Sequence, residues 1–288
     1  MTCRSWIALT LVSFVACSSS ADDEPGPGPP TVRIDARIGP PDPADAPPPT
    51  VGGGGLPGVI VLAWSGDFIG GFAGFASTAT VEPSRPCTSE TIQACTIKTC
   101  PSPADAPDAL EASAGTIVIS GGTEPVVMKP AALLSGGYDV TDGFGARLVD
   151  GQTVTVAADG GDVPAFSGVA AKVPTGITVG GDFSLIDTSQ DLHIFWGGGG
   201  ADGKVVARFS SDDSTTVTTA TCEFDGLAGE GTVPMDVWQR LAPCPSDGGP
   251  VCTWQVVPQV VTHFVAGDWS VDFLVMARGA VGLYHNDR

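Results

Sequence analysis

Three histidines are the first side chains to consider for catalysis, because histidine titrates near neutral pH. They are His193 in DLHIFW, His263 in QVVTHFVA and His285 in the terminal YHNDR. His193 alternates with apolar neighbours, and the spacing supplies it with no nucleophile or orienting acid. We interpret His193 as an ordinary strand residue, His263 as a core or interface residue and His285 as a solvated residue.

Motifs that usually accompany hydrolysis, metal catalysis or nucleotide binding are missing from the sequence. GxSxG, HExxH and GxxxxGK[ST] do not occur. Carboxylates are numerous, but no spacing singles out an acid pair of the kind that glycosidases use. We therefore expect no enzymatic activity.

Calcium is the one cofactor that some acidic, glycine-containing loops would suit, since it prefers oxygen ligands. None of these loops has the twelve-residue EF-hand spacing, and acidic turns that keep an exported protein soluble are the simpler interpretation. The loops are YDVTDG (138–143), DGGD (159–162), DFSLIDTSQD (182–191) and SSDDS (210–214).

The overall charge is strongly acidic. The 288 residues include 13 Lys and Arg against 32 Asp and Glu, for a net charge of −19. Such a charge repels nucleic acid and anionic lipid surfaces, so we expect no nucleic-acid partner. Glycine (39) and proline (25) are abundant and long helical patches are missing. This composition favours an all-β protein outside the cytoplasm.

The first sixteen residues have the layout of a secretory signal. One arginine precedes an apolar run from Trp6 to Ala16, which is too short to span a bilayer as a helix. The end of this run together with the next residue, Phe14-Val15-Ala16-Cys17, resembles a bacterial lipobox, Leu-(Ala/Ser/Val)-(Gly/Ala)-Cys, with a departure at Phe14. The resemblance implies that residues 1–16 are removed and that Cys17 carries the lipid. An Asp after the cysteine often retains such proteins at the inner membrane, so Ser18 implies the outer membrane.

Residues 17–57 have the composition of a tether. From Ser18 to Pro57 there are eleven prolines, six acids and few large apolar residues. Such a segment cannot bury enough apolar surface to offset its ordering entropy, so we expect a disordered linker. The protein would then contact the membrane only through the lipid on Cys17.

Six cysteines remain once Cys3 and Cys17 are set aside, and an even number in an exported protein predicts disulfides rather than zinc. Cys244 and Cys252 flank the turn-rich PSDGGPV and form the best-supported pair. Cys95 and Cys100 would lie on opposite faces of one strand, which forbids a bond between them. We expect Cys87 to pair with Cys95 across a turn at TSET, which leaves Cys100 for Cys222.

Period-two alternation dominates from Gly58 onward. In QTVTVAADGG (152–161), Val154 and Val156 face one side and Thr153 and Thr155 the other, as in a half-buried strand. Many such short strands predict antiparallel β-sandwich domains of immunoglobulin-like or jelly-roll-like type. We expect two, at 58–174 and 175–288, with one elaborated sandwich as the alternative. Only PMDVWQRLA (234–242) reads as a helix.

A second resemblance lies in the body. FGARLVDGQTVTVAADGGDVPAFSG and TCEFDGLAGEGTVPMDVWQRL resemble a group of uncharacterised predicted β-sandwich lipoproteins of Gram-negative bacteria. The likeness covers about half of the chain, in strand and turn patterns. It implies the architecture and the location and carries no activity.

We expect a non-enzymatic structural, adhesive or interaction module displayed from the outer membrane, with an envelope protein or a polysaccharide as its partner. The alternative is a carbohydrate-binding or hydrolytic envelope protein. A carbohydrate platform would need an exposed row of aromatic side chains. Five tryptophans follow the signal: Trp64, Trp196, Trp238, Trp254 and Trp269. Trp64, Trp196 and Trp269 begin or end strands among apolar neighbours, which favours core positions.

Replacement of Cys17 by serine tests the anchor. We expect Cys17→Ser to lose the acyl mass and to leave the membrane fraction, because no other segment predicts membrane attachment. Cell fractionation with mass spectrometry measures both. A variant that stays in the membrane fraction with unchanged mass would contradict the anchor.

Overall fold

The computed structural model describes residues 56–65, 68–75, 87–101, 112–131, 137–181, 183, 185–213, 215–244 and 251–285. All of them belong to the second of the two units into which the chain divides, Met1–Pro47 and Pro48–Arg288. The expected signal, Cys17 and almost all of the expected tether lie outside the described residues.

The described fold is all-β, as expected, with one short helix, α1 (Met235–Trp238). The helix expected over 234–242 is therefore a single turn. The strands are β1 (Leu56–Ser65), β2 (Phe68–Phe75), β3 (Thr88–Ile92), β4 (Cys95–Pro101), β5 (Ile117–Ser120), β6 (Val126–Pro130), β7 (Tyr138–Asp142), β8 (Thr153–Ala158), β9 (Phe166–Lys172), β10 (Ile177–Gly180), β11 (Leu192–Gly198), β12 (Lys204–Asp212), β13 (Thr216–Asp225), β14 (Glu230–Val233), β15 (Val251–Ala266), β16 (Trp269–Met276) and β17 (Ala280–Leu283).

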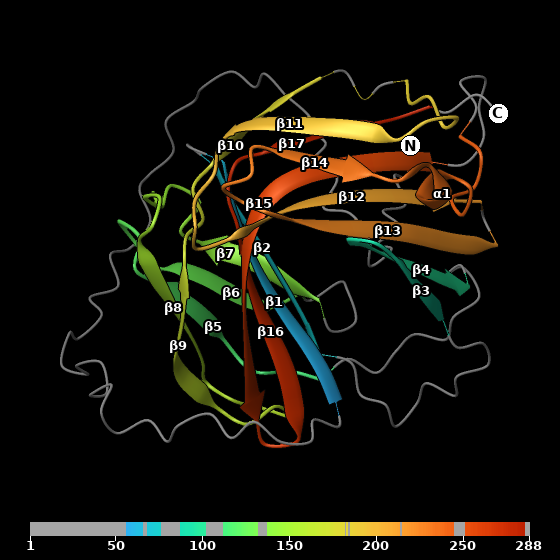
Figure 1. The fold of residues 1–288 in the computed structure, drawn as a ribbon. Coiled ribbons are helices and arrows are strands. Elements are labelled where there is room, and N and C mark those ends of the chain that lie inside the picture. Colours follow the sequence, from blue (N-terminus) through green and yellow to red (C-terminus); the bar gives the residue numbers. More distant parts are fainter. Residues whose placement is uncertain are drawn as a thin grey trace, which may run out of the picture. The chain divides into compact units, whose positions relative to one another are not determined.

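Three sheets contain these strands (Figure 1). The largest has nine strands in the order β2-β1-β16-β15-β12-β13-β4-β3, with β17 also paired to β15. A five-stranded sheet has the order β7-β6-β5-β8-β9, and a three-stranded sheet the order β10-β11-β14. Among these strands the pairing is antiparallel except between β1 and β16, which run parallel.

The buried side chains of the strands follow the alternation predicted from the sequence. In β8, Val154 and Val156 are fully buried while Thr153 is exposed, so the strand is half-buried as predicted. In β16, Trp269, Val271, Phe273 and Val275 are all buried on one face.

The first hydrophobic core lies between the five-stranded sheet and the part of the large sheet made by β2, β1, β16 and the end of β15. Phe75 sits in its centre, with its ring centroid 6.0 Å from that of Tyr138 and 5.9 Å from that of Trp269. The buried Tyr138 hydroxyl accepts a hydrogen bond from the amide of Ala114 at 2.6 Å, which satisfies its polar atom inside the core.

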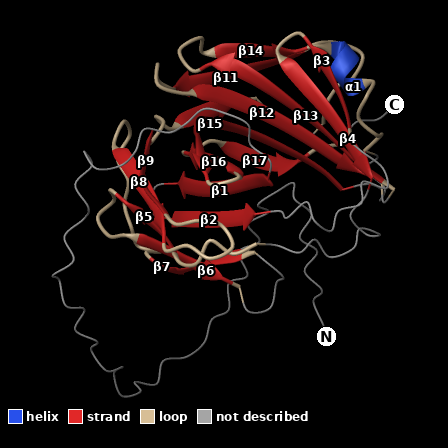
Figure 2. Cartoon of the chain, turned by 90° about the horizontal axis from the view of Figure 1, so that it is seen from below, coloured by secondary structure: helices blue, strands red, loops and turns tan. Residues whose placement is uncertain are grey.

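The second core lies between the three-stranded sheet with α1 and the part of the large sheet made by β15, β12, β13 and β4. Here Trp238 of α1 packs edge-on against Phe209 of β12, with ring centroids 4.7 Å apart. Figure 2 shows β11, β14 and α1 together on this side of the large sheet.

The strand β15 belongs to both cores. Val256, in the first half of the strand, is buried in the second core. Phe264, near the end of the strand, is buried in the first core. The pairing changes along the strand in the same way: β12 pairs with Val251–Gln259 and β16 with Gln259–Ala266. Figure 1 shows β15 curving from the row of β12 and β13 to the row of β1 and β16.

Pro258 lies at the point in β15 where pairing with β12 ends and pairing with β16 begins. Its carbonyl accepts a hydrogen bond from the amide of Ala277, in the turn between β16 and β17. The N–H and C=O of one residue point to the same side of a strand, so the N–H that proline lacks would face this turn and not β12. The ladder therefore loses no bond at Pro258.

The large sheet crosses Pro174, where the boundary between two domains was expected. It takes β1 to β4 from before this residue and β12, β13 and β15 to β17 from after it. The cores follow the boundary only in part, because β4 contributes Ile97 to the second core and β16 contributes Phe273 to the first.

All six expected cysteines are in disulfides. Cys244 pairs with Cys252, as expected. The other pairings were expected wrongly: Cys87 bonds to Cys100, and Cys95 to Cys222. TSET is part of strand β3 and not a turn.

The true turn lies at Gln93 and Ala94, since Ile92 pairs with Cys95. This register places Cys87 opposite Cys100, next to the pair of Thr88 and Thr99. It also leaves Cys95 to face its direct partner on β13, Cys222, with 3.9 Å between their Cα atoms.

The disulfides that close the longest and the shortest segments should contribute different amounts to the free energy of unfolding. Cys95–Cys222 closes a segment of 127 residues and Cys244–Cys252 one of 8. On the chain-entropy estimate, alanine replacement of both partners lowers the free energy of unfolding by about 5 kcal/mol for the first pair and about 2.5 kcal/mol for the second. Urea unfolding of the two double variants measures this. An equal or larger loss for the Cys244–Cys252 variant would contradict it.

Candidate functional site

The described residues bring one set of potentially catalytic side chains together, on the outer face of β15 and β16. His263 pairs directly with Asp272 across the two strands, and its Nδ1 lies 2.9 Å from the Asp272 Oδ1. The other ring nitrogen, Nε2, lies 3.4 Å from the Ser270 Oγ. We call Ser270, His263 and Asp272 the His263 cluster. The order of its hydrogen bonds is that of a nucleophile, a base and an orienting acid.

The position of His263 contradicts the core alternative of the expectation that it is a core or interface residue, and it leaves the interface alternative untested. Its side chain is 53% exposed and that of Asp272 is 51% exposed. The inward positions at this end of β15 belong to Phe264 and Ala266, which are buried in the first core. His263 therefore lies on the outward face with Val261 and Val265.

The surroundings of the His263 cluster differ from those of a hydrolase site. Acyl transfer needs donors aimed at the developing oxyanion, usually free backbone amides. Ser270 lies in a strand that is paired on both sides, with Val265 of β15 and Pro57 of β1, so its backbone groups belong to the sheet. His263 and Asp272 are both half-exposed, so their interaction lies in high dielectric and contributes little to stability. The arrangement can donate and accept hydrogen bonds, and the backbone of Ser270 is engaged in the sheet.

Apolar side chains flank the His263 cluster. The register pairs Val59 of β1 with Asp272, and Leu274 of β16 with Val261, which is 47% exposed. A mixed surface of this kind, with hydrogen-bonding groups among accessible apolar ones, suits contact with another molecule better than it suits catalysis.

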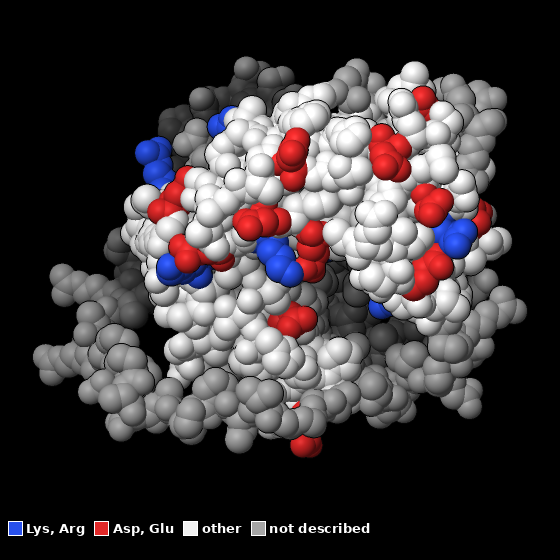
Figure 3. Space-filling view, in the orientation of Figure 1, with Lys and Arg blue, Asp and Glu red and all other residues white. Residues whose placement is uncertain are grey.

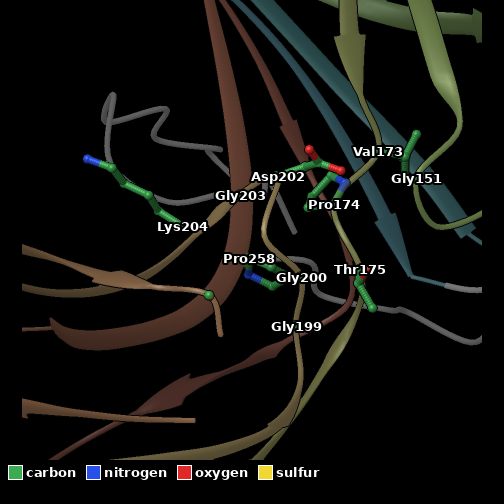
Figure 4. A pocket seen from close by; sticks show the side chains of 11 residues that line it. Gly151, Val173, Pro174, Thr175, Gly199, Gly200, Asp202, Gly203, Lys204 and Pro258 are labelled. Atoms are coloured by element: carbon green, nitrogen blue, oxygen red, sulfur yellow. The ribbon is translucent and has the colours of Figure 1, made fainter. Parts of the chain in front are cut away.

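A shallow pocket lies where the loops between the two cores meet (Figure 4). It is lined mainly by glycine and proline, together with Thr175, Asp202 and Lys204. Its volume of about 20 Å³ leaves room for roughly one water molecule, whereas small-molecule sites usually measure about 300–1,000 Å³.

Backbone packing explains the glycines of this pocket. Gly199 has φ +88°, and a Cβ at this position would meet the Gly226 carbonyl oxygen at 2.4 Å. Glycine is required there for the close approach of two loops.

The other two histidines also have structural surroundings. His193 is exposed on β11, and its Nδ1 lies 3.1 Å from the Thr232 hydroxyl on β14. Asp191, on the same outward face, accepts the amide of Met235 at 2.7 Å at the start of α1. His285 is partly buried, whereas a solvated tail residue was expected, and its backbone carbonyl accepts the amide of Ile186.

All five tryptophans expected in the body are described, and they do not form an exposed row. Trp196, Trp238 and Trp269 are buried, and Trp64 and Trp254 are partly buried against the two cores. A carbohydrate platform would therefore have to use other side chains.

Asp213 and Asp187, in two of the acidic loops considered for calcium, use their carboxylate oxygens within their own turns. The side chain and amide of Thr215 and the amide of Thr216 donate to Asp213, and these hydrogen bonds lower the pKa of Asp213 to about 2. Hydrogen bonds from Ser189 lower the pKa of Asp187 in the same way. Nowhere in the described ranges do three His, Cys, Asp or Glu side chains gather closely enough to hold a metal ion.

Charged residues are dispersed over the face of the molecule that Figure 3 shows. Figure 3 shows acidic side chains spread across one face, with fewer basic ones among them. Exposed ion pairs join Lys172 to Asp202 at 3.0 Å and Lys204 to Glu223. In the part of the chain that the structure describes, no helix has the length and apolarity needed to cross a membrane.

Comparison with known proteins identifies no relative of this chain. No protein-family model, no curated protein and no solved structure matches the chain significantly.

Proposed function

We propose that the chain is a lipid-anchored protein of the outer membrane whose body is a non-enzymatic structural, adhesive or interaction module. The observation that carries this proposal is the pairing of all six body cysteines in disulfides. Disulfides persist in oxidising compartments and are rare in the cytosol. They support export, which is the first step that the signal and Cys17 require.

The junction between the tether and the body supports display from a membrane. The acidic, proline-rich residues that follow Cys17 lead directly into β1 at Leu56. A linker of about 40 residues in a polyproline-like state would reach on the order of 100 Å, enough to hold the body well clear of the lipid. The net charge of −19 further disfavours contact with an anionic surface.

Three features of the body support binding or structure over catalysis. The His263 cluster lies on a flat, half-exposed sheet face, the pocket between the cores has room for about one water molecule, and the tryptophans pack into the cores. The mixed apolar and hydrogen-bonding face around His263 is the surface best suited to an envelope protein or polysaccharide partner.

Hydrolysis is the second candidate function, and the geometry of Ser270, His263 and Asp272 is the observation that favours it. A serine activated by this histidine would react with a fluorophosphonate probe, whereas an ordinary strand serine would not.

Labelling of the full-length protein with a fluorophosphonate probe separates the two functions. We expect no modification of Ser270 above the level in Ser270→Ala, because the sheet leaves no amide free to stabilise the oxyanion. Peptide mass spectrometry measures the modification. His263→Ala is the matched control: labelling of Ser270 in the wild type that disappears in this variant would contradict the non-enzymatic proposal.

A further inference from the structure

The strand that receives the tether occupies an unusual place in the large sheet. β1 is the first strand of the body, and yet it lies inside the sheet, between β2 and β16. An N-terminal strand at an edge would be held on one side only. This inference rests on the proposed anchor, since it concerns what happens when the tether is under load.

Hydrogen-bonded pairing holds β1 on both sides over most of its length. Eight residues, Leu56 to Ala63, are in register with Trp269 to Met276 of β16, and eight, Gly58 to Ser65, with Phe75 to Phe68 of β2. The ladder begins at the first residue of the strand, because the amide of Leu56 donates to the Asp268 carbonyl at 3.1 Å.

The parallel direction of β1 and β16 determines how a pull would load these bonds. Force that enters at Leu56 and leaves at the far end of β16 acts along both strands in opposite senses. All eight register pairs then share the load and must yield together. Force applied at Leu56 and Asp268 acts at the same end of the two strands, so the pairs open one after another.

Side-chain packing opposes sliding of β1 as well. Ile60 and Leu62 are fully buried in the first core. A slip of one residue would turn both side chains to the outer face, because successive side chains point to opposite sides of a sheet. Only a slip of two residues restores the alternation, and it breaks every bond of the ladder on the way.

We propose that β1 is a mechanical clamp that transmits load from the tether to the folded body in shear. The clamp keeps the body folded when the anchor and a bound partner are drawn apart. The pairs of β1 with β16 and with β2 carry the load, and the core positions of Ile60 and Leu62 prevent slippage.

Single-molecule force spectroscopy on the full mature chain without lipid tests the clamp. One handle is attached at the N-terminus and the other at a click-reactive residue that replaces exposed Arg278, just after β16. The matched control carries the second handle in place of exposed Asp268, at the other end of the same strand. We expect a rupture force roughly threefold or more higher for the Arg278 handle at equal loading rate, because the register pairs share the load there.

Equal rupture forces for the two attachments, or a higher force for the Asp268 handle, would overturn the clamp. Both attachment sites are exposed and only their side chains change, so urea unfolding should match the wild type in both proteins. The test does not use the lipid. Failure of the anchor at Cys17 would remove the proposed function and leave the force ratio measurable, so the two outcomes are distinguishable.

Discussion

The fold depends on one strand that is shared by two hydrophobic cores. β15 has 16 residues, which exceeds the usual 3–10 and extends over about 50 Å. No single core of this size could cover it, so its two halves pack against different sheets. Val256 and Phe264 lie on the same face of the strand but in different cores. The change of partner at Pro258 is where the strand turns from one core to the other.

The same constraint brings several loops together where the two cores meet. The loops that meet there approach so closely that glycine is needed at position 199, and the remaining space holds about one water molecule. Chemistry-bearing side chains are left on outward sheet faces, as in the His263 cluster. A disulfide-linked body with a mixed outer surface agrees with the proposed interaction module.

Local patterns in the sequence were sufficient where the structure is local. The alternation in β8 and β16 predicted which valines are buried, and the turn-rich loop predicted the pair of Cys244 and Cys252. The wrong pairing of Cys87 arose because the turn at Gln93 and Ala94 contains no glycine, proline, asparagine or aspartate. Gln93 adopts a positive φ of 53°, which its residue type does not signal.

The pairing of strands that lie far apart in the chain could not be predicted from the sequence. The parallel pairing of β1 with β16 joins segments more than 200 residues apart, and nothing in VIVLAW indicates its partner. The His263 cluster depends on a more local feature of the sequence. The hairpin at Ala266-Gly267-Asp268-Trp269 sets the register of β15 and β16, and this register alone brings His263 opposite Asp272.

Native-state hydrogen exchange under increasing urea tests most directly whether the shared strand makes the two cores one cooperative unit. The amides of β8 report on the first core and those of β11 on the second. If β15 couples the cores, the slowest amides of both strands open with the same free energy and the same dependence on urea. A β11 that exchanges through a separate opening, with a lower free energy and a smaller urea dependence than β8, would contradict this account.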